Sequence, residues 1–293
     1  NVANAYKIVQ ETNAFEVLSQ EVGEDVETKL IEEMFEPSID YHRSFPVFNN
    51  NVEFNKALGL ISLGGALRDS SYIHEAIEWV VNYTPNIYLF DGFYRETTVS
   101  YHIQTTNGIN AVLDELYGWS DRENYVSPRT GLNVQNLDMN DEFTILGNAN
   151  KIPHQVVYPD GKHFPTQDTW ANNVSDNPQL DVGSFLFPAA GIARMAGGLE
   201  EGGDPSQLYL TFQPRYGHHH FDPLNLALYA NGQELLPDIG YTHTLYRQWT
   251  NSTLGHNTVV VNSQDASSGG GARDGGNIDT FKSNEDGIQV TRA

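Results

Sequence analysis

The residue types best suited to chemistry gather between residues 217 and 257. Three consecutive histidines, His218–His220, open this segment; a single acid follows at Asp238 in Pro-Asp-Ile-Gly, and a last histidine stands at His256 in Gly-His-Asn-Thr. His220, Asp238 and His256 together offer two imidazoles and one carboxylate, a donor set that zinc or a similar divalent ion accepts. We therefore predict one bound divalent ion, zinc first, with manganese or calcium as alternatives.

The elements that must position these groups can be predicted from the intervening residues. Leu224, Leu226 and Leu228 recur with period two, and Asn231-Gly232 is the dipeptide that favours a type I′ hairpin turn. We expect the three donors on paired antiparallel strands. On a strand, His218 and His220 would point to the same side, so a ligand and a base could share one face. The competing interpretation is a polar histidine-rich loop with Asp238 in a turn, because histidine clusters alone are weak metal signals.

Two segments of the first half also carry polar groups. Asn49, Asn50 and Asn51 stand at the start of an apolar-periodic helix, where one asparagine would suffice as a cap and further amides could hold something else. The second segment runs from Asp91-Gly92 to Tyr101 and His102 and leads into another helix. Taken alone, Tyr101 is better interpreted as a packed aromatic than as a catalyst, although a buried phenol would need a partner.

The periodicity of the chain changes once. Residues 1–120 show helical spacing in four apolar stripes and predict helical hairpins in the manner of an α/α barrel or toroid; Pro37, Pro46 and Pro85 are expected to close helices. Residues 121–180 are rich in Asn, Asp, Pro and Gly and predict a long, decorated connection. Residues 181–293 predict strands at 184–187, 191–195, 208–212, 224–229 and 258–261. The expected fold class is α+β, an incomplete α/α toroid followed by an antiparallel, sandwich-type β-sheet domain.

Composition limits the classes of partner. The 293 residues carry 16 basic and 38 acidic side chains, a formal net charge of −22, which disfavours nucleic acid because phosphate binding needs a basic surface. There are no cysteines, and no apolar stretch approaches the length of a membrane span. The chain opens as if inside a helix and closes as if inside a strand, so we expect a piece of a longer bacterial protein. We expect that protein to be secreted or periplasmic, although this chain carries no signal sequence; its oligomeric state is left open.

Four segments, in order, resemble the heparinase II/III-like polysaccharide lyases. Asn49-Asn50-Asn51-Val-Glu-Phe resembles the family's Asn-His element, and Asp91-Gly…Glu96…Tyr101-His102 resembles its Asp-Gly…Glu…Tyr element. The segment 186–194 resembles the strand that opens the sheet domain. The most specific likeness is Gly217-His-His-His-Phe-Asp222 with Asp238 and His256-Asn-Thr. The likeness covers about residues 25 to 265. One departure is that an asparagine stands where the family has histidine after its catalytic Asn, so Asn50 and Asn51 are both candidates for that role.

The resemblance implies the chemistry of uronate β-elimination. Amide donors from Asn50 or Asn51, helped by an arginine, would stabilise the enolate-like intermediate. His218 could take the proton from the sugar, and Tyr101 could return one to the leaving oxygen or do both jobs. The ion at His220, Asp238 and His256 would be structural. Further residues expected to line the substrate groove are Asn49, Arg95, His102, Tyr241, Tyr246 and Arg247.

The sequence thus predicts a lyase that cleaves a uronic-acid polymer. The scarcity of basic residues favours a carboxylate-only polymer such as alginate, with ulvan or a glycosaminoglycan as alternatives. Two other classes remain. A non-catalytic carbohydrate-binding protein would use the same surface without turnover, and a metal-dependent hydrolase would use the three metal donors around an activated water.

Overall fold

The computed structural model describes residues 2–46, 49–176, 179–214, 216–266, 276–283 and 289–293. The chain divides into two compact units. The helical unit comprises Asn1–Asn86 and Asn107–Phe143, and the sheet unit comprises Ile87–Thr106 and Thr144–Ala293. This division differs from the expected ranges, because residues 87–106 count with the sheet unit and the connection at 121–180 is shared between the two units.

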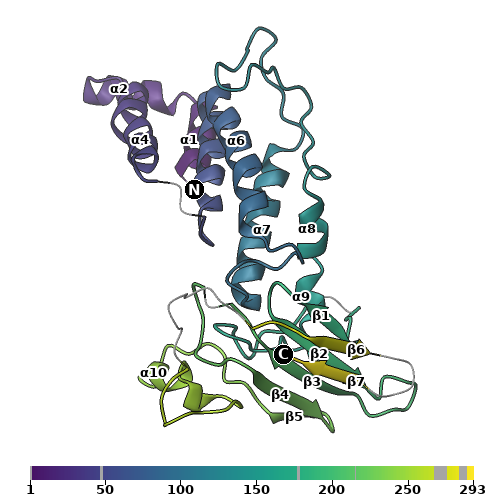
Figure 1. Ribbon diagram of the computed structural model, residues 1–293. Coiled ribbons are helices and arrows are strands. Elements are labelled where there is room, and N and C mark those ends of the chain that lie inside the picture. Colours follow the sequence, from purple (N-terminus) through teal and green to yellow (C-terminus); the bar gives the residue numbers. More distant parts are fainter. Residues whose placement is uncertain (1, 47–48, 177–178, 215, 267–275, 284–288) are drawn as a thin grey trace. The chain divides into compact units, whose positions relative to one another are not determined.

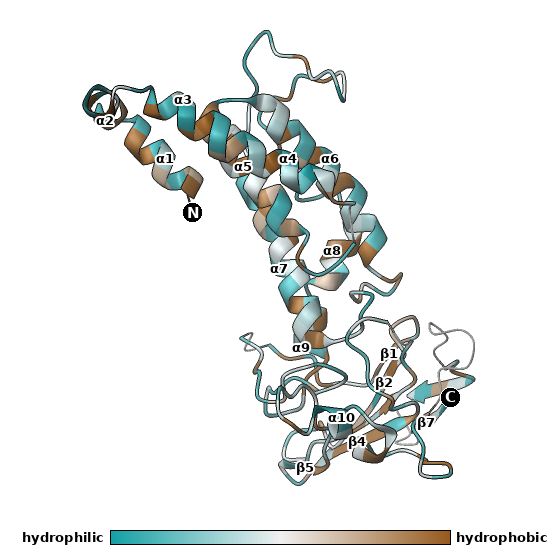
Figure 2. Ribbon diagram, turned by 90° about the vertical axis from the view of Figure 1, so that its left-hand side faces the viewer, coloured by the Kyte–Doolittle hydropathy of each residue, from teal (hydrophilic) through white to brown (hydrophobic). Residues whose placement is uncertain are grey.

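The four apolar stripes of the first half all form helices, as predicted. The helices are α1 (Val2–Gln10), α2 (Ala14–Val22), α3 (Val26–Leu30), the π-helical turn η1 (Ile31–Phe35), α4 (Glu36–Ser44), α5 (Phe54–Leu67), α6 (Ser70–Ile87) and α7 (Val99–Leu116). Hydrophobic and hydrophilic residues alternate around α5 and α6 (Figure 2), as expected for helices with one buried face. The prediction that Pro85 closes a helix was wrong, because it lies in the last turn of α6. A proline has no N–H to bond the Val81 carbonyl, so α6 continues to Ile87 with that one helical hydrogen bond missing.

A buried contact between a histidine and a carboxylate holds the loop after α7 against α6 in the helical unit. The Nε2 atom of His74 lies 2.8 Å from an oxygen of Asp121, and its Nδ1 atom lies 3.1 Å from the hydroxyl of Thr130. Asp121 also accepts hydrogen bonds from the indole of Trp119 and the backbone N–H of Val134. Because the partners of Asp121 come from α6 and from the loop after α7, its carboxylate holds these two parts of the helical unit together.

The sheet unit contains, among its described residues, a five-stranded antiparallel sheet (Figure 1). Its strands lie side by side in chain order: β1 (Phe185–Phe187), β2 (Ile192–Gly197), β3 (Ser206–Thr211), β4 (Asn225–Ala230) and β5 (Gln233–Leu236). A separate antiparallel pair is formed by β6 (Thr280–Ser283) and β7 (Gln289–Arg292). Strand β7 of this pair contacts β2 of the five-stranded sheet. The α+β class with an antiparallel sheet domain is therefore confirmed.

The predicted hairpin is present between β4 and β5. Asn231 and Gly232 have φ values of 53° and 72°, the left-handed pair that a type I′ turn requires. Asn225, Ala227 and Tyr229 form the buried face of β4, whereas Leu226 points outward. The strand predicted at 258–261 was wrong: in the described part of this segment the only pairing is a single bridge from Val261 to Gln264.

The core of the sheet unit is aromatic. Tyr158 and Phe164, from the 144–180 segment, contact Tyr209 of β3, and the rings of Phe164 and Tyr209 stack with centroids 4.1 Å apart. Val99, at the start of α7, packs into the same cluster. The first turn of α7 is thereby fixed against the sheet, which decides where the following side chains lie.

Arg194 joins the 155–183 segment to β2. It is fully buried, and its guanidinium donates hydrogen bonds to backbone carbonyls, including those of Gly183 at 2.6 Å and Asp181 at 2.8 Å. The guanidinium also stacks on the Phe185 ring at 4.4 Å. Several carbonyl acceptors and one carboxylate contact compensate the burial of this charge.

The short helices of the sheet unit lie in its connections. They are α8 (Thr144–Ala149), α9 (Ile152–Gln155), α10 (Arg247–Thr250) and the 3₁₀ turn η2 (Thr253–Gly255). None of the helices in the described part of the chain is long and apolar enough to cross a membrane.

Candidate active site

The first turn of α7 presents Tyr101 and is tied to the segment 166–170. The Thr98 hydroxyl accepts from the Tyr101 N–H at 3.2 Å, and the Thr169 hydroxyl accepts from the Val99 N–H at 2.8 Å. In the opposite direction, the Ser100 hydroxyl accepts from the Trp170 N–H at 3.0 Å. The first two bonds satisfy N–H groups that a helix start leaves unpaired. The bonds to Thr169 and Trp170 bring residues 166–170 beside the first turn of α7.

Gln167 connects the same segment to the histidine run. Its amide donates to Gln213 at 3.0 Å and to Asp222 at 2.9 Å, while its oxygen accepts from the His220 N–H. The three histidines lie in the loop between β3, which ends at Thr211, and β4, which begins at Asn225. The prediction that His218 and His220 lie on a strand was therefore wrong. The loop nevertheless turns both rings toward one carboxylate, Asp168.

Gly217 is required where the histidine run begins. Its φ is 63°, and a Cβ atom at this position would lie 2.6 Å from the carboxylate of Glu96. Glu96 itself is buried and has one oxygen without a partner among the described residues. Burial raises its pKa, against the opposing charges of His218 and Arg95. A larger residue at 217 would displace either this carboxyl group or the histidines.

Tyr101 and His218 lie together, as predicted. Their rings stack with centroids 3.7 Å apart and planes inclined by 14°. Burial raises the pKa of the Tyr101 phenol, and a hydrogen bond with Tyr241 and the nearby charges of Asp168 and Glu96 raise it further. The phenol therefore holds its proton at neutral pH and can act as a proton donor. The His218 side chain is 34% exposed, so the pair is open to a substrate.

Asp168 is a site residue that was not predicted from the sequence. One of its oxygens lies 2.9 Å from the Nδ1 atom of His218, and the other lies 2.9 Å from the Nε2 atom of His220. Arg247 adds a contact of 2.6 Å through its Nη2 atom. Burial opposes ionisation of Asp168, but these three partners outweigh it and hold the pKa of the carboxyl well below its usual range. Asp168 belongs to no recognisable motif, and it lies in a segment that contains several other aspartates and asparagines.

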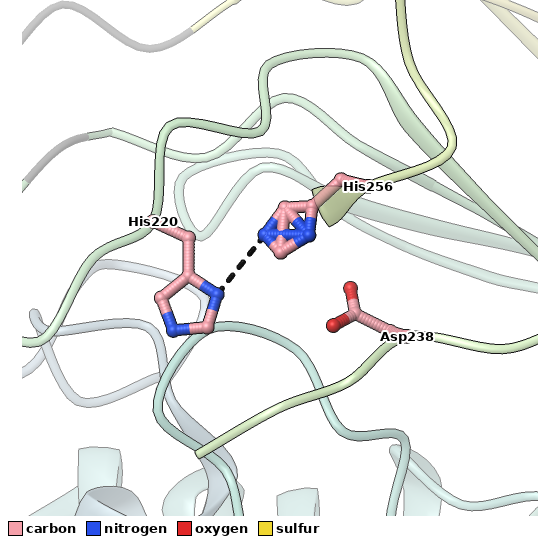
Figure 3. Close-up of side chains that lie close together, drawn as sticks. All are labelled: His220, Asp238 and His256. Carbon is pink, nitrogen blue, oxygen red and sulfur yellow. Dashed lines mark hydrogen bonds between the residues drawn. The ribbon is translucent and has the colours of Figure 1, made fainter. Parts of the chain in front are cut away.

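The three predicted metal donors also converge. His220, Asp238 and His256 each place one donor atom within 4.8 Å of the other two, although they lie in loops before β4, after β5 and after η2 (Figure 3). The Nδ1 atom of His220 is 3.1 Å from the Nε2 atom of His256. Two nitrogens bound to one tetrahedral zinc at about 2.0–2.1 Å would stand roughly 3.3 Å apart, close to this separation.

The charges around these donors suit a cation. Burial and the neighbouring charge of Asp222 raise the pKa of Asp238 to about 7. One oxygen of Asp222 and the Nδ1 atom of His256 are buried without a partner among the described residues. Two buried carboxyl groups beside two imidazoles therefore leave donor capacity that a divalent ion would use. The residues present fit such an ion.

Aromatic rings continue from the Tyr101–His218 pair. Tyr241 lies 6.4 Å from each of those rings, and Trp170 and His243 contact Tyr241 at centroid distances of 4.6 and 4.4 Å. Trp170 is 41% exposed. Arg247 lies over the Tyr241 ring at 4.8 Å, and its Nη1 atom is buried without a partner among the described residues. Tyr241 and Arg247, both predicted for the groove, thus lie at the site, and Trp170 and His243 were missed.

Arg95 and Tyr246 are further residues of the sheet unit that were predicted for the groove. Arg95 donates to the hydroxyl of Tyr216 and stacks over its ring at 4.5 Å. Tyr246 precedes α10 and is 72% exposed.

His102 is fully buried, and both of its ring nitrogens are hydrogen bonded, to the Tyr94 N–H and the Ala149 carbonyl. Burial lowers its pKa to about 4. We therefore assign His102 to the support of α7 and not to the substrate groove.

Asn49, Asn50 and Asn51 belong to the helical unit, at the turn before α5. The side-chain oxygen of Asn50 accepts from the Val52 N–H at 3.0 Å, and its backbone carbonyl accepts from the Tyr83 hydroxyl. This local bond is the capping-type role that asparagine fills at helix starts. A role for these amides at the Tyr101–His218 pair stays a prediction.

Comparison with known families bears on the second half of the chain. Residues 181–293 match the family described as heparinase II/III-like, C-terminal. This stretch is therefore similar to the C-terminal domain of that family. The expected resemblance is thus confirmed, and the matched region begins at the residue where the sheet domain was predicted to start. The matched stretch contains every member of the metal set and His218, whereas Tyr101 and Asp168 precede it.

Individual proteins are also similar to this chain in sequence or in fold. An exo-oligoalginate lyase of Saccharophagus degradans is 39% identical over a stretch that covers 16% of this chain and 8% of that protein. The crystal structure of heparinase III superposes with a TM-score of 0.59 at 18% identity, over 82% of this chain and 43% of that one. The heparan sulfate lyase HepC of Pedobacter heparinus gives 0.56 at 15% identity, over 82% and 42%. The chain therefore spans less than half the length of these solved structures and shares their fold.

Proposed function

We propose that the protein to which this chain belongs is a polysaccharide lyase that cleaves a uronate polymer by β-elimination. The observation that carries the proposal is the stacked pair of Tyr101 and His218, a protonated phenol and an imidazole at one open site. Elimination needs a base for the proton next to the carboxylate and an acid for the leaving oxygen, and these two side chains supply that combination. The match to a heparinase II/III-like domain and the lyases among the relatives support the same reaction class.

The proton route follows from the two side chains. A neutral His218, with Nδ1 bonded to Asp168, has its Nε2 lone pair free to take the proton from C5 of the uronate. The electron pair of that C–H bond forms the C4–C5 double bond as the bond from C4 to the bridging oxygen breaks. Tyr101 gives its proton to that oxygen, and the products are an unsaturated uronate end and a free hydroxyl. Water is not consumed.

The carboxylate of the substrate must be neutralised before its neighbouring proton becomes acidic. We propose that the guanidinium of Arg247, whose side chain is 31% exposed, contacts this carboxylate. Amide donors from Asn50 or Asn51 would add hydrogen bonds to the enolate-like intermediate, in the manner of an oxyanion hole. Asn49, Arg95, Tyr241 and Tyr246 remain proposed contacts further along the chain of sugars.

We also propose one divalent ion, zinc first, held by His220, Asp238 and His256. It would supply a fixed positive charge that ties three loops of the sheet unit together. His220 and Asp238 are 1% and 5% exposed, so a substrate has little access to these donors. This burial supports a structural ion and disfavours the metal-dependent hydrolase, which needs an open coordination position.

The favoured substrate is alginate. The chain carries few cations for its size, and a heavily sulfated polymer would meet a strongly negative protein. The local match to an exo-oligoalginate lyase supports the same choice, whereas the heparinases among the solved structures share only 15–18% identity. Ulvan and glycosaminoglycans are the alternatives, and a secreted or periplasmic location would suit any of them.

The proposal is tested by incubating the protein with alginate, ulvan, heparan and chondroitin separately. Formation of the unsaturated uronate is followed by its ultraviolet absorbance. We expect a linear increase with alginate that disappears in His218→Ala. A carbohydrate-binding protein would retain the polymer in affinity electrophoresis and give no increase with any of the four. Turnover of another polymer and not of alginate would keep the lyase and remove the alginate assignment.

A further inference from the structure

Two functional clusters of the sheet unit meet at one buried side chain, Asp168. The proposed base, His218, contacts one carboxylate oxygen through Nδ1, and the proposed ion ligand, His220, contacts the other through Nε2, both at 2.9 Å. The Asp168 side chain is 1% exposed, and its backbone N–H donates to the His218 carbonyl at 3.3 Å. The carboxylate is thus fixed by the same loop whose rings it holds.

An ionised carboxylate only accepts hydrogen bonds, so each ring must turn a protonated nitrogen toward it. This leaves His218 with Nε2 as its free nitrogen and His220 with Nδ1. The Nδ1 atom of His220 is the one that lies 3.1 Å from His256 inside the metal set. A carboxylate on the second nitrogen of a metal-binding histidine is a common way to fix its tautomer and orientation.

We propose that Asp168 is a positioning residue that fixes which nitrogen His218 offers to the substrate and which nitrogen His220 offers to the ion. Its role at His218 rests on the proposed lyase function, whereas the two tautomers do not. Arg247 shares the carboxylate and balances its charge, so the ion, the base and the guanidinium all depend on one side chain.

The decisive variant is Asp168→Asn, which keeps the size of the side chain. An amide has one accepting oxygen and one donating nitrogen, so it cannot accept from both imidazoles. One of the two rings must then change tautomer or lose its bond. Nitrogen-15 spectra of the ring atoms, assigned with His218→Gln and His220→Gln, measure this directly. In the wild type we expect His218 protonated on Nδ1 and His220 on Nε2.

Asp168→Asn should also weaken zinc binding by about 10–100-fold in competition with a chelator. If the protein is a lyase, kcat should fall by a similar factor while KM stays within a few-fold. The matched control is Asp121→Asn, because Asp121 is a buried carboxylate that contacts His74 in the helical unit. The control should lower the melting temperature and leave the His218 and His220 spectra and the zinc affinity unchanged.

The outcomes separate the two proposals. A wild-type protein that forms no unsaturated product removes the lyase, yet the tautomers and the zinc affinity still decide the role of Asp168. Unchanged spectra and zinc affinity in a folded Asp168→Asn variant would reduce Asp168 to a packing role, even if the enzyme is active. Should that variant fail to fold, the opposite tautomer of either histidine in the wild type would overturn the inference.

Discussion

Replacing Tyr101 by phenylalanine removes one hydroxyl and leaves the ring that stacks on His218 at 3.7 Å. The packing volume is kept, so the loss in folding is limited to the hydrogen bond with Tyr241, about 1 kcal/mol of unfolding free energy. The loss in catalysis is larger. Removing a positioned acid lowers kcat by roughly 10²–10⁴-fold, or about 3–5 kcal/mol of transition-state free energy.

The assay is the initial rate of unsaturated product from alginate, with oligosaccharide affinity measured by calorimetry. We expect kcat to fall by that factor while affinity stays within a few-fold. Tyr117→Phe is the matched control, because this tyrosine of the helical unit is 63% exposed and is not among the proposed substrate contacts, and it should retain nearly full activity. The double variant with His218→Ala should be scarcely slower than either single variant, because both groups act in one proton-transfer sequence. A Tyr101→Phe variant that keeps most of its kcat would refute Tyr101 as the proton donor.

Three further predictions follow from the same geometry. His220→Ala and His256→Ala should each lower the melting temperature and abolish zinc binding while leaving the order of preferred polymers unchanged; metal analysis that finds no ion in the native protein would count against this. Burial lowers the pKa of His102 to about 4 from the ordinary 6.5, so the unfolded chain binds this proton first as pH falls. The resulting stability is present above pH 6.5 and is lost between pH 6.5 and 4. The loss amounts to about 3 kcal/mol of unfolding free energy. Denaturant titrations at several pH values measure it, and an equal loss in the His102→Asn variant would contradict the assignment to His102. Trp170→Ala should raise KM several-fold with kcat nearly unchanged, because the exposed indole would stack on a sugar ring; an unchanged KM would remove that contact.

The fold was largely predictable where one rule dominates. Apolar stripes at helical spacing became helices, and Asn231-Gly232 gave the hairpin because few other dipeptides tolerate two left-handed residues. The same local rules misassigned 258–261, where an apolar stretch stays out of the sheet. Pro85 was misjudged because α6 runs two residues beyond it, to Ile87, despite the lost hydrogen bond to Val81.

The candidate site was predictable only in part, because its members are joined by tertiary contacts. The types and order of His220, Asp238 and His256 marked a donor set, and the structure brings them together in loops rather than on strands. Asp168 carries no local signal, since its importance comes from residues 50 to 79 positions away that meet at its two oxygens. The position of His102 next to Tyr101 in the sequence was a misleading signal, because the His102 side chain is fully buried and does not line the groove.

The most direct test of the central claim is the fate of water during cleavage. Alginate oligomers are digested in H₂¹⁸O, and the products are weighed by mass spectrometry. A β-elimination adds no water, so we expect unsaturated products whose masses sum to that of the substrate, with ¹⁸O entering only by exchange of the anomeric oxygen at reducing ends. Products that are heavier by one labelled water would show hydrolysis and contradict the proton route from His218 to Tyr101.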